Sequence, residues 1–286
     1  MIPIWRLWRG DARVDAIDPG DRGFAYGDGL FETILVHRGV PVWWDAHMAR
    51  LALGCARLGI PNPHADFLRH QADALIDGRA RGVLKLILTR GVGARGYAPP
   101  TDALSTVAMC LSDPPPLPPR AGLTLRWCAT PLAIQPRLAG IKHLNRLEQV
   151  LARAEWSDAD PDTSSIHEGL MCDTSGRVVA ATSANLFVLR DGRWLTPPVA
   201  DCGIAGICRG WILDHIQGAG EATLSRADVE SADAVILCNA VRGILAVAAV
   251  GQRRWAMHEA VRGLRAALAL AEPAFAAIES AASESL

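Results

Sequence analysis

Lys142 is the residue with the clearest chemical potential in this chain. It opens the run Lys142–Leu151, directly after the apolar, glycine-containing approach Leu138–Ile141. A lysine at the mouth of an amphipathic helix, behind an apolar approach, is partly desolvated, and desolvation lowers the pKa of a lysine amine and makes it nucleophilic. The run therefore predicts a Schiff-base lysine. The alternative for an isolated lysine is a surface side chain at a helix entry.

Three further positions have the chemistry of anion binding. Gly206-Ile207-Cys208 opens a predicted helix through Trp211–Leu213, so its backbone N–H groups and the positive helix end can face an anion. Arg50 offers a permanently charged fork of donors, and Arg95 lies in a glycine-flanked loop that can reach a carboxylate. The alternatives are an ordinary glycine loop and solvated arginines.

The elements that must position these residues can be read from apolar spacing. The residues at 48, 51, 52, 55 and 58 recur at helical spacing, with Asp45 as the expected N-cap and Gly59 as the stop. The runs 83–88, 106–111, 123–129 and 234–238 predict buried strands. Turns are expected at 173–176 and 191–192. We also expect a helix after Lys142, lined by Leu144, Leu147, Leu151 and Ala154, and a helical tail from Met257.

A proline-rich segment divides the chain. Residues 113–120 contain five prolines, which fix φ and remove backbone donors, so this segment cannot join a helix or a sheet interior. We expect it to be a linker between an N-terminal α/β domain at 1–112 and a larger C-terminal domain at 121–286. No internal repeat is evident.

Composition narrows the functional class. The chain has 286 residues, half of them hydrophobic, so we expect a compact α/β protein. A formal net charge of -1 without a basic block favours a small-molecule partner over a nucleic acid, and no apolar run is long enough to span a membrane. Seven scattered cysteines without a C-x-x-C pair indicate reduced thiols, no disulfide frame and no metal site. The start lacks the pattern of a signal peptide, which predicts a cytoplasmic protein.

Several segments, in this order and spacing, resemble the fold-type IV pyridoxal-phosphate enzymes, and within that group the aminodeoxychorismate lyases. The segments cover nearly the whole chain: 21–33, 47–51, 90–97, 139–151, 182–187 and 203–209. The resemblance implies a two-domain α/β (α+β) fold with the cofactor in a cleft between the domains, pyridoxal 5'-phosphate as the cofactor and a homodimer.

The resemblance also implies roles for individual residues. Lys142 corresponds to the lysine that holds the cofactor and moves protons, and Thr33 to a hydroxyl that favours elimination over amino transfer. Arg50, Gly206, Ile207, Cys208, Asn239, Ala240 and Tyr26 correspond to cofactor-binding positions, and Arg95 and Tyr97 to substrate-binding positions. Arg242 is a further candidate for a second substrate carboxylate. In each case the alternative is an ordinary structural residue, such as Thr33 as a β-branched strand former.

One position departs from the family pattern. Most members have a glutamate that pairs with the pyridine nitrogen of the cofactor, and here Ala180 stands at that position. Loss of a charge-assisted hydrogen bond, worth about 1.5–3 kcal/mol, disfavours amino transfer more than a lyase reaction, because aromatisation drives the latter. Glu168 is the nearest upstream carboxylate, at a different spacing.

The sequence thus predicts a lyase that converts 4-amino-4-deoxychorismate to 4-aminobenzoate and pyruvate, a step toward folate. Two alternatives stay open: a D-amino-acid or branched-chain aminotransferase on the same scaffold, and a protein that binds the cofactor with little catalysis. One scaffold supports several reactions, so the fold alone does not choose among them.

Overall fold

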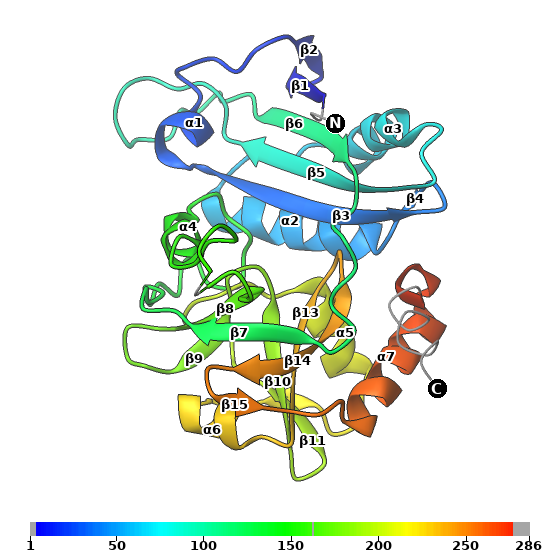
Figure 1. Ribbon diagram of the computed structural model, residues 1–286. Helices are drawn as coiled ribbons and strands as arrows, with labels where there is room; N and C mark the ends of the chain where they lie inside the picture. Colours follow the sequence, from blue (N-terminus) through cyan, green and yellow to red (C-terminus); the bar gives the residue numbers. More distant parts are fainter. Residues whose placement is uncertain (1–3, 162, 277–286) are drawn as a thin grey trace. The chain divides into compact units, whose positions relative to one another are not determined.

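A computed structural model describes residues 4–161 and 163–276 of the chain (Figure 1). The chain forms two compact units, Met1–Pro114 with Ile141–Asn145, and Pro115–Gly140 with Arg146–Leu286. The change of unit at Pro114 falls within the proline-rich segment. The short return Ile141–Asn145, which contains Lys142, belongs to the first unit, whereas the sequence places it in the second domain.

The first unit is built on an antiparallel sheet with the strand order β2-β1-β6-β5-β3-β4. The strands are β1 (Trp5–Arg9), β2 (Ala12–Val14), β3 (Gly29–His37), β4 (Val40–Pro41), β5 (Arg81–Thr89) and β6 (Thr106–Ser112). Its helices are α1 (Arg22–Tyr26), α2 (Trp44–Leu58) and α3 (Ala65–Ile76). The strands predicted at 83–88 and 106–111 are therefore confirmed as β5 and β6.

The register of this sheet separates its residues into two faces, because side chains alternate along a strand. Leu30 pairs with Leu88, and Glu32 with Leu86, on the face covered by α2. A Cβ added to Gly54 of α2 would lie 2.7 Å from Leu30, so helix and strand approach closely there. Phe31 and Thr33, with their partners Ile87 and Lys85, lie on the opposite face.

Helix α2 confirms one predicted boundary and corrects the other. Gly59 is its C-cap with φ 64°, a left-handed conformation that suits glycine. Asp45 is not the N-cap: the helix begins after Trp43, and Asp45 lies in the first turn. Trp43 makes no side-chain cap, and Trp44, the first residue of the helix, is buried at 9% exposure.

The second unit contains a larger mixed sheet. In the described residues its strand order is β12-β11-β10-β13-β14-β7-β8-β9, with β15 paired to β14. The strands are β7 (Leu123–Trp127), β8 (Glu168–Cys172), β9 (Val178–Ala181), β10 (Asn185–Arg190), β11 (Arg193–Thr196), β12 (Gly220–Glu221), β13 (Ala234–Asn239), β14 (Gly243–Val250) and β15 (Arg253–Arg254). The helices are α4 (Leu147–Arg153), α5 (Ile207–His215), α6 (Arg226–Ser231), α7 (Glu259–Ala271) and a short 3-10 turn (Pro273–Phe275).

Most predicted elements of the second unit are confirmed. The strands expected at 123–129 and 234–238 are β7 and β13, and the tail from Met257 contains α7 and the 3-10 turn. The rest of that predicted helical tail, 277–286, lies outside the described residues. Asp191-Gly192, with φ 51° and 73°, makes the hairpin between β10 and β11. Asp173 and Gly176 close the turn between β8 and β9 through a 2.9 Å hydrogen bond.

The helix expected after Lys142 is shorter than predicted. It begins at Leu147, so Leu144 lies before it, and Leu147 and Leu151 are 76% and 59% exposed in this chain. The apolar repeat therefore does not form a buried face within the unit. All seven cysteines are buried and free. Within residues 4–161 and 163–276, no helix combines the length and apolar character needed to cross a bilayer.

Candidate active site

Lys142 lies in an extended segment beside the first residues of β3. Phe31 donates its backbone N–H to the carbonyl of Lys142 at 2.9 Å, and Leu144 donates to the carbonyl of Gly29 at 3.0 Å. Lys142 is thus held by a sheet edge, and the prediction that it sits at the mouth of a helix is wrong. Its Nζ lies 4.1 Å from the centroid of the Phe31 ring. The ring fixes the amine above the sheet by a cation–π contact.

Thr33 lies on the same face of β3 as Phe31, two residues further along. Its side chain is partly buried, and residue 85 is its partner on β5. The local sequence therefore places a primary amine, an aromatic ring and a hydroxyl along one face of one strand. This arrangement suits proton transfer by the amine with the hydroxyl nearby.

Arg50 and Glu32 form a buried pair on the opposite face of β3, and His47 joins them from α2. Arg50 Nε donates to Glu32 Oε1 at 2.9 Å, one terminal nitrogen of Arg50 donates to Glu32 Oε2, and His47 Nδ1 lies 2.7 Å from Oε2. Glu32 and His47 are 1% and 0% exposed. Arg50, predicted to bind the cofactor phosphate, therefore already has a carboxylate partner.

The charges of this cluster follow from burial and hydrogen bonding. Burial alone would raise the pKa of Glu32, but hydrogen bonds from His47 and Arg50, with the charge of Arg50, outweigh it and lower that pKa to about 2. Burial lowers the pKa of His47, which is therefore neutral at pH 7. Among the described residues, His47 Nε2 is buried without a hydrogen-bond partner.

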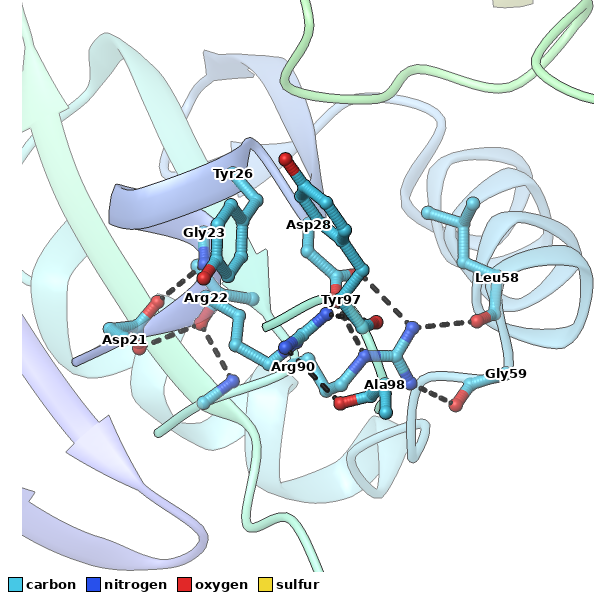
Figure 2. Close-up of polar contacts among 12 residues, drawn as sticks. Asp21, Arg22, Gly23, Tyr26, Asp28, Leu58, Gly59, Arg90, Tyr97 and Ala98 are labelled. Atoms are coloured by element: carbon cyan, nitrogen blue, oxygen red, sulfur yellow. Dashed lines mark hydrogen bonds and ion pairs between the residues drawn. The ribbon is translucent and has the colours of Figure 1, made fainter. Parts of the chain in front are cut away.

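A second buried cluster anchors the loop that carries Arg95 and Tyr97 (Figure 2). Arg22 and Arg90 both donate to Asp28, at 2.9 and 2.7 Å. Arg22 also donates to the carbonyls of Gly96 and Tyr97, at 2.9 and 3.0 Å. These two arginines lower the pKa of Asp28 through their hydrogen bonds, against the opposing effect of burial.

Arg90 connects the same cluster to the end of α2. Its terminal nitrogens donate to the carbonyls of Leu58 and Gly59 at 2.7 and 2.6 Å, next to its two bonds with Asp28 (Figure 2). The orphan carbonyls at a helix end need such donors. A single carboxylate, Asp28, therefore positions both arginines and through them the loop and the helix end.

The predicted substrate residues Arg95 and Tyr97 are exposed in this chain, Tyr97 at 85%. The ring of Tyr97 lies 5.5 Å from that of Tyr26, and the Tyr26 hydroxyl accepts a 3.4 Å hydrogen bond from Gly96 N. The structure thus brings Tyr26 to the loop of the predicted substrate residues. Its placement at the cofactor phosphate stays a prediction.

The predicted anion site of the second unit is the start of α5. Gly206 is the N-cap of this helix and offers no side-chain oxygen to the first-turn N–H groups of Ile207 and Cys208. A Cβ at Gly206 would lie 2.0 Å from Asn185 Oδ1, so glycine is required there. Asn185 in turn donates to the carbonyl of Ile204 at 2.9 Å and holds the approach to the helix.

Asn239 ends β13, as expected, and shapes the turn that contains Ala240. Its Oδ1 accepts from the backbone N–H groups of Val241 and Arg242 at 3.0 and 2.8 Å. In the described part of the chain, Arg242 Nε is buried without a hydrogen-bond partner. Burial lowers the pKa of Arg242, with Glu168 opposing that effect. Arg242 therefore stays a candidate for a ligand carboxylate.

Ala180 lies in β9, is buried at 8% exposure, pairs with Met171 of β8 and belongs to a buried apolar cluster that includes Cys202. Its methyl group offers no hydrogen bond. Glu168 has other partners: the hydroxyls of Thr182 and Ser183 donate to its two oxygens, and Gly169 N donates at 2.9 Å. Both oxygens of Glu168 therefore already accept hydrogen bonds, which counts against Glu168 as a substitute for the carboxylate that is missing at Ala180.

Sequence reasoning missed the residues that hold the predicted ones in place. Glu32 and Lys85 are charged residues inside apolar strands, and that signal could have identified them. The others form ion pairs or hydrogen bonds across gaps of 6 to 62 residues, which no local pattern reveals: His47, Arg22, Asp28, Arg90, and the two hydroxyl donors to Glu168, Thr182 and Ser183.

Comparison with known proteins finds relatives that cover most of the chain. Residues 29–250 match the family described as amino-transferase class IV. The chain is 34% identical to an aminodeoxychorismate lyase of Vibrio harveyi over 239 residues, 81% of this chain and 86% of that protein. It is 28% identical to a putative branched-chain-amino-acid aminotransferase of Methanocaldococcus jannaschii over 246 residues, 83% of this chain and 82% of that protein.

A solved structure extends this likeness. The crystal structure of 4-amino-4-deoxychorismate lyase from Pseudomonas aeruginosa superposes with a TM-score of 0.84 at 42% identity, and covers 92% of this chain and 98% of that chain. The expected α/β fold of the type IV enzymes is therefore confirmed.

Proposed function

The chain belongs to the class IV amino-transferase family, whose enzymes depend on pyridoxal 5'-phosphate, and we propose that it converts 4-amino-4-deoxychorismate to 4-aminobenzoate and pyruvate. The observation that carries this proposal is the primary amine of Lys142 on the same face of β3 as Thr33, in a chain that is 42% identical to a solved lyase. The elimination needs a base and a proton donor at one place.

The residues present fit the cofactor. An aldehyde requires a primary amine, which Lys142 offers in the first unit. A phosphate requires N–H donors or a cation; taken separately, the second unit offers the first-turn N–H groups of α5 and the first unit offers Arg50. The buried, unpartnered Nε2 of His47, within the described residues, is a polar atom that the protein alone leaves unsatisfied. Ala180 is the exception, because a methyl group cannot pair with the pyridine nitrogen.

When bound, pyridoxal phosphate holds the substrate amine and draws electrons from the carbon that bears it, which makes the C–H bond there acidic. In the proposed reaction the amine of Lys142 accepts the proton from ring carbon 4. The bond between ring carbon 3 and the ether oxygen then breaks, and its electron pair leaves with the enolpyruvyl group. Lys142 returns the proton to the methylene carbon of that group, with the Thr33 hydroxyl as relay, so that pyruvate and an aromatic ring result.

An aminotransferase is the second candidate, favoured by the 28% identity to the Methanocaldococcus protein. Amino transfer requires a carbanion that persists until a proton returns elsewhere, and a protonated pyridine nitrogen stabilises it. Ala180 offers no carboxylate for that nitrogen. We therefore rank amino transfer below elimination, and a cofactor-binding protein with little catalysis below both.

The test is to mix the purified protein, saturated with pyridoxal phosphate, with enzymatically prepared 4-amino-4-deoxychorismate and to measure both products. Equal amounts of pyruvate and 4-aminobenzoate support the lyase. Amino transfer from D-alanine or a branched-chain amino acid to a 2-oxo acid, without these products, supports the aminotransferase. Cofactor binding without either reaction supports the binding protein. A cytoplasmic homodimer remains part of the proposal, and sedimentation of the holoenzyme tests the dimer.

A further inference from the structure

Lys85 belongs to a pair of lysines that stand out in this chain. Of its 29 lysine and arginine residues only two are lysines, Lys85 and Lys142. Arginine serves elsewhere as the cation, in exposed ion pairs as well as in buried ones. Because lysine carries a compact ammonium rather than a planar fork, a lysine kept in such a chain indicates a position that needs a small cation or an amine.

Both lysines contact the same aromatic ring. The Nζ of Lys85 lies 3.8 Å, and that of Lys142 4.1 Å, from the centroid of Phe31. Both distances lie within the range of cation–π contacts, and two atoms that each lie about 4 Å from one centroid are no more than about 8 Å apart. Two of the chain's amines therefore converge on one face of the first sheet.

The charge of Lys85 has no carboxylate partner among the described residues. The two titratable groups whose negative form would act on it are Glu32 and Cys110. Glu32 lies on the opposite face of β3 and is already bonded to Arg50 and His47. Cys110 is a neutral thiol, because burial raises its pKa.

The surroundings of Lys85 strengthen its attraction for an anion. Burial lowers its pKa and outweighs the opposing effect of the Glu32 charge, because an ammonium that is partly removed from water is costly. An incoming carboxylate would remove that cost, and a charge interaction in a partly desolvated place is stronger than one in bulk water.

The register places this cation next to the hydroxyl assigned to the departing group. Lys85 on β5 and Thr33 on β3 are direct cross-strand partners. Side chains of such pairs lie about 4.5–5.5 Å apart at their Cβ atoms. A group that receives a proton relayed by Thr33 therefore lies within reach of the Lys85 ammonium.

We propose that Lys85 binds the carboxylate of the enolpyruvyl group and so orients that group for departure from the substrate. The inference rests on the proposed lyase function and adds to it a residue that determines substrate specificity. Lys85 recognises the half of the substrate that becomes pyruvate. The carboxylate on the ring, which stays with 4-aminobenzoate, binds elsewhere.

The experiment compares Lys85→Met and Lys85→Gln with the wild-type holoenzyme. Loss of a charge-assisted hydrogen bond should raise KM for 4-amino-4-deoxychorismate by roughly tenfold to a hundredfold, with a smaller change in kcat. Inhibition by added pyruvate should weaken by a similar factor, whereas inhibition by added 4-aminobenzoate should change less than about twofold. Lys85→Arg, which keeps the charge, should fall between the wild type and Lys85→Met.

Arg81→Met is the matched control, because it removes a cation from an exposed position of the same strand. Its KM should match that of the wild type. Cofactor absorbance verifies that each variant holds pyridoxal phosphate, and Lys85→Gln decides the question if Lys85→Met does not fold. An unchanged KM in the folded variants overturns the inference, and so does a loss of inhibition by 4-aminobenzoate alone. A wild-type enzyme that releases no pyruvate overturns the proposed function instead.

Discussion

Glu32→Gln tests the buried cluster that holds Arg50. The pKa of Glu32 falls from its ordinary value of 4.5 to about 2 in the folded protein, so its ionised form is stabilised by folding. That difference corresponds to about 3 kcal/mol of stability at neutral pH, in the range expected when one partner of a buried pair is removed. A glutamine at position 32 would leave Arg50 charged, 9% exposed and without its carboxylate. We expect the free energy of unfolding to decrease by about 3 kcal/mol.

The assay is urea denaturation of wild type and Glu32→Gln as apoproteins, so that cofactor binding does not contribute. The pH dependence has a definite sign: a lowered pKa gives stability that is present above pH 4.5 and lost as the pH falls toward about 2. The difference between the two proteins should therefore shrink over that interval. A double-mutant cycle with Arg50→Met should show coupling of the two residues.

The control is Asp73→Asn, which breaks the exposed pair between Arg69 and Asp73, whose side chains are 40% and 50% exposed. An exposed pair contributes little, so this change should cost less than about 0.5 kcal/mol. If Glu32→Gln costs no more than Asp73→Asn, the inference that Glu32 stabilises Arg50 is refuted.

Three further predictions concern the cofactor. Borohydride should fix the pyridoxal group on Lys142 and not on Lys85, the one other lysine of the sequence, and mass spectrometry of the digested protein checks this; a label on Lys85 would reassign the site. Gly206→Ala should weaken cofactor binding at least tenfold, because the Cβ of the alanine would lie 2.0 Å from Asn185 Oδ1. A fluorescence titration measures the dissociation constant, and an unchanged value would contradict the argument. Ala180→Glu should raise the rate of amino transfer from D-alanine by roughly tenfold or more. It should also lower the melting temperature, because the position is 8% exposed and a larger side chain would overpack it. A stopped-flow rate of amino transfer equal to that of the wild type would count against the role of this position.

The strands of the fold could be predicted because their signal is local. The apolar runs at 83–88 and 106–111 became β5 and β6, and Asp191-Gly192 became the expected hairpin. The helix predicted after Lys142 begins only at Leu147, for a physical reason. Backbone hydrogen bonds of Phe31 and Leu144 hold that segment against β3, and a segment engaged in a sheet cannot also be helical.

In the candidate site, too, some residues could be predicted from local sequence, and others are defined only by contacts in the folded chain. Lys142, Thr33 and Arg50 could be selected from their residue types and their resemblance to a family. Their partners could not, because Glu32, on β3, meets His47 and Arg50 only after α2 packs on that strand. Lys85 likewise meets Phe31 only through the pairing of β5 with β3.

The pairing of Arg50 with Glu32 also changes how phosphate binding should be understood. A buried arginine without a carboxylate would be costly in the empty protein, and Glu32 removes that cost. The same carboxylate reduces the net attraction that Arg50 can offer to a phosphate, because the ligand meets a neutralised pair. The backbone N–H groups at the start of α5 carry no such counter-charge, since Gly206 caps that helix without a side chain. We therefore expect loss of the glycine at 206 to weaken cofactor binding more than loss of the charge at Arg50.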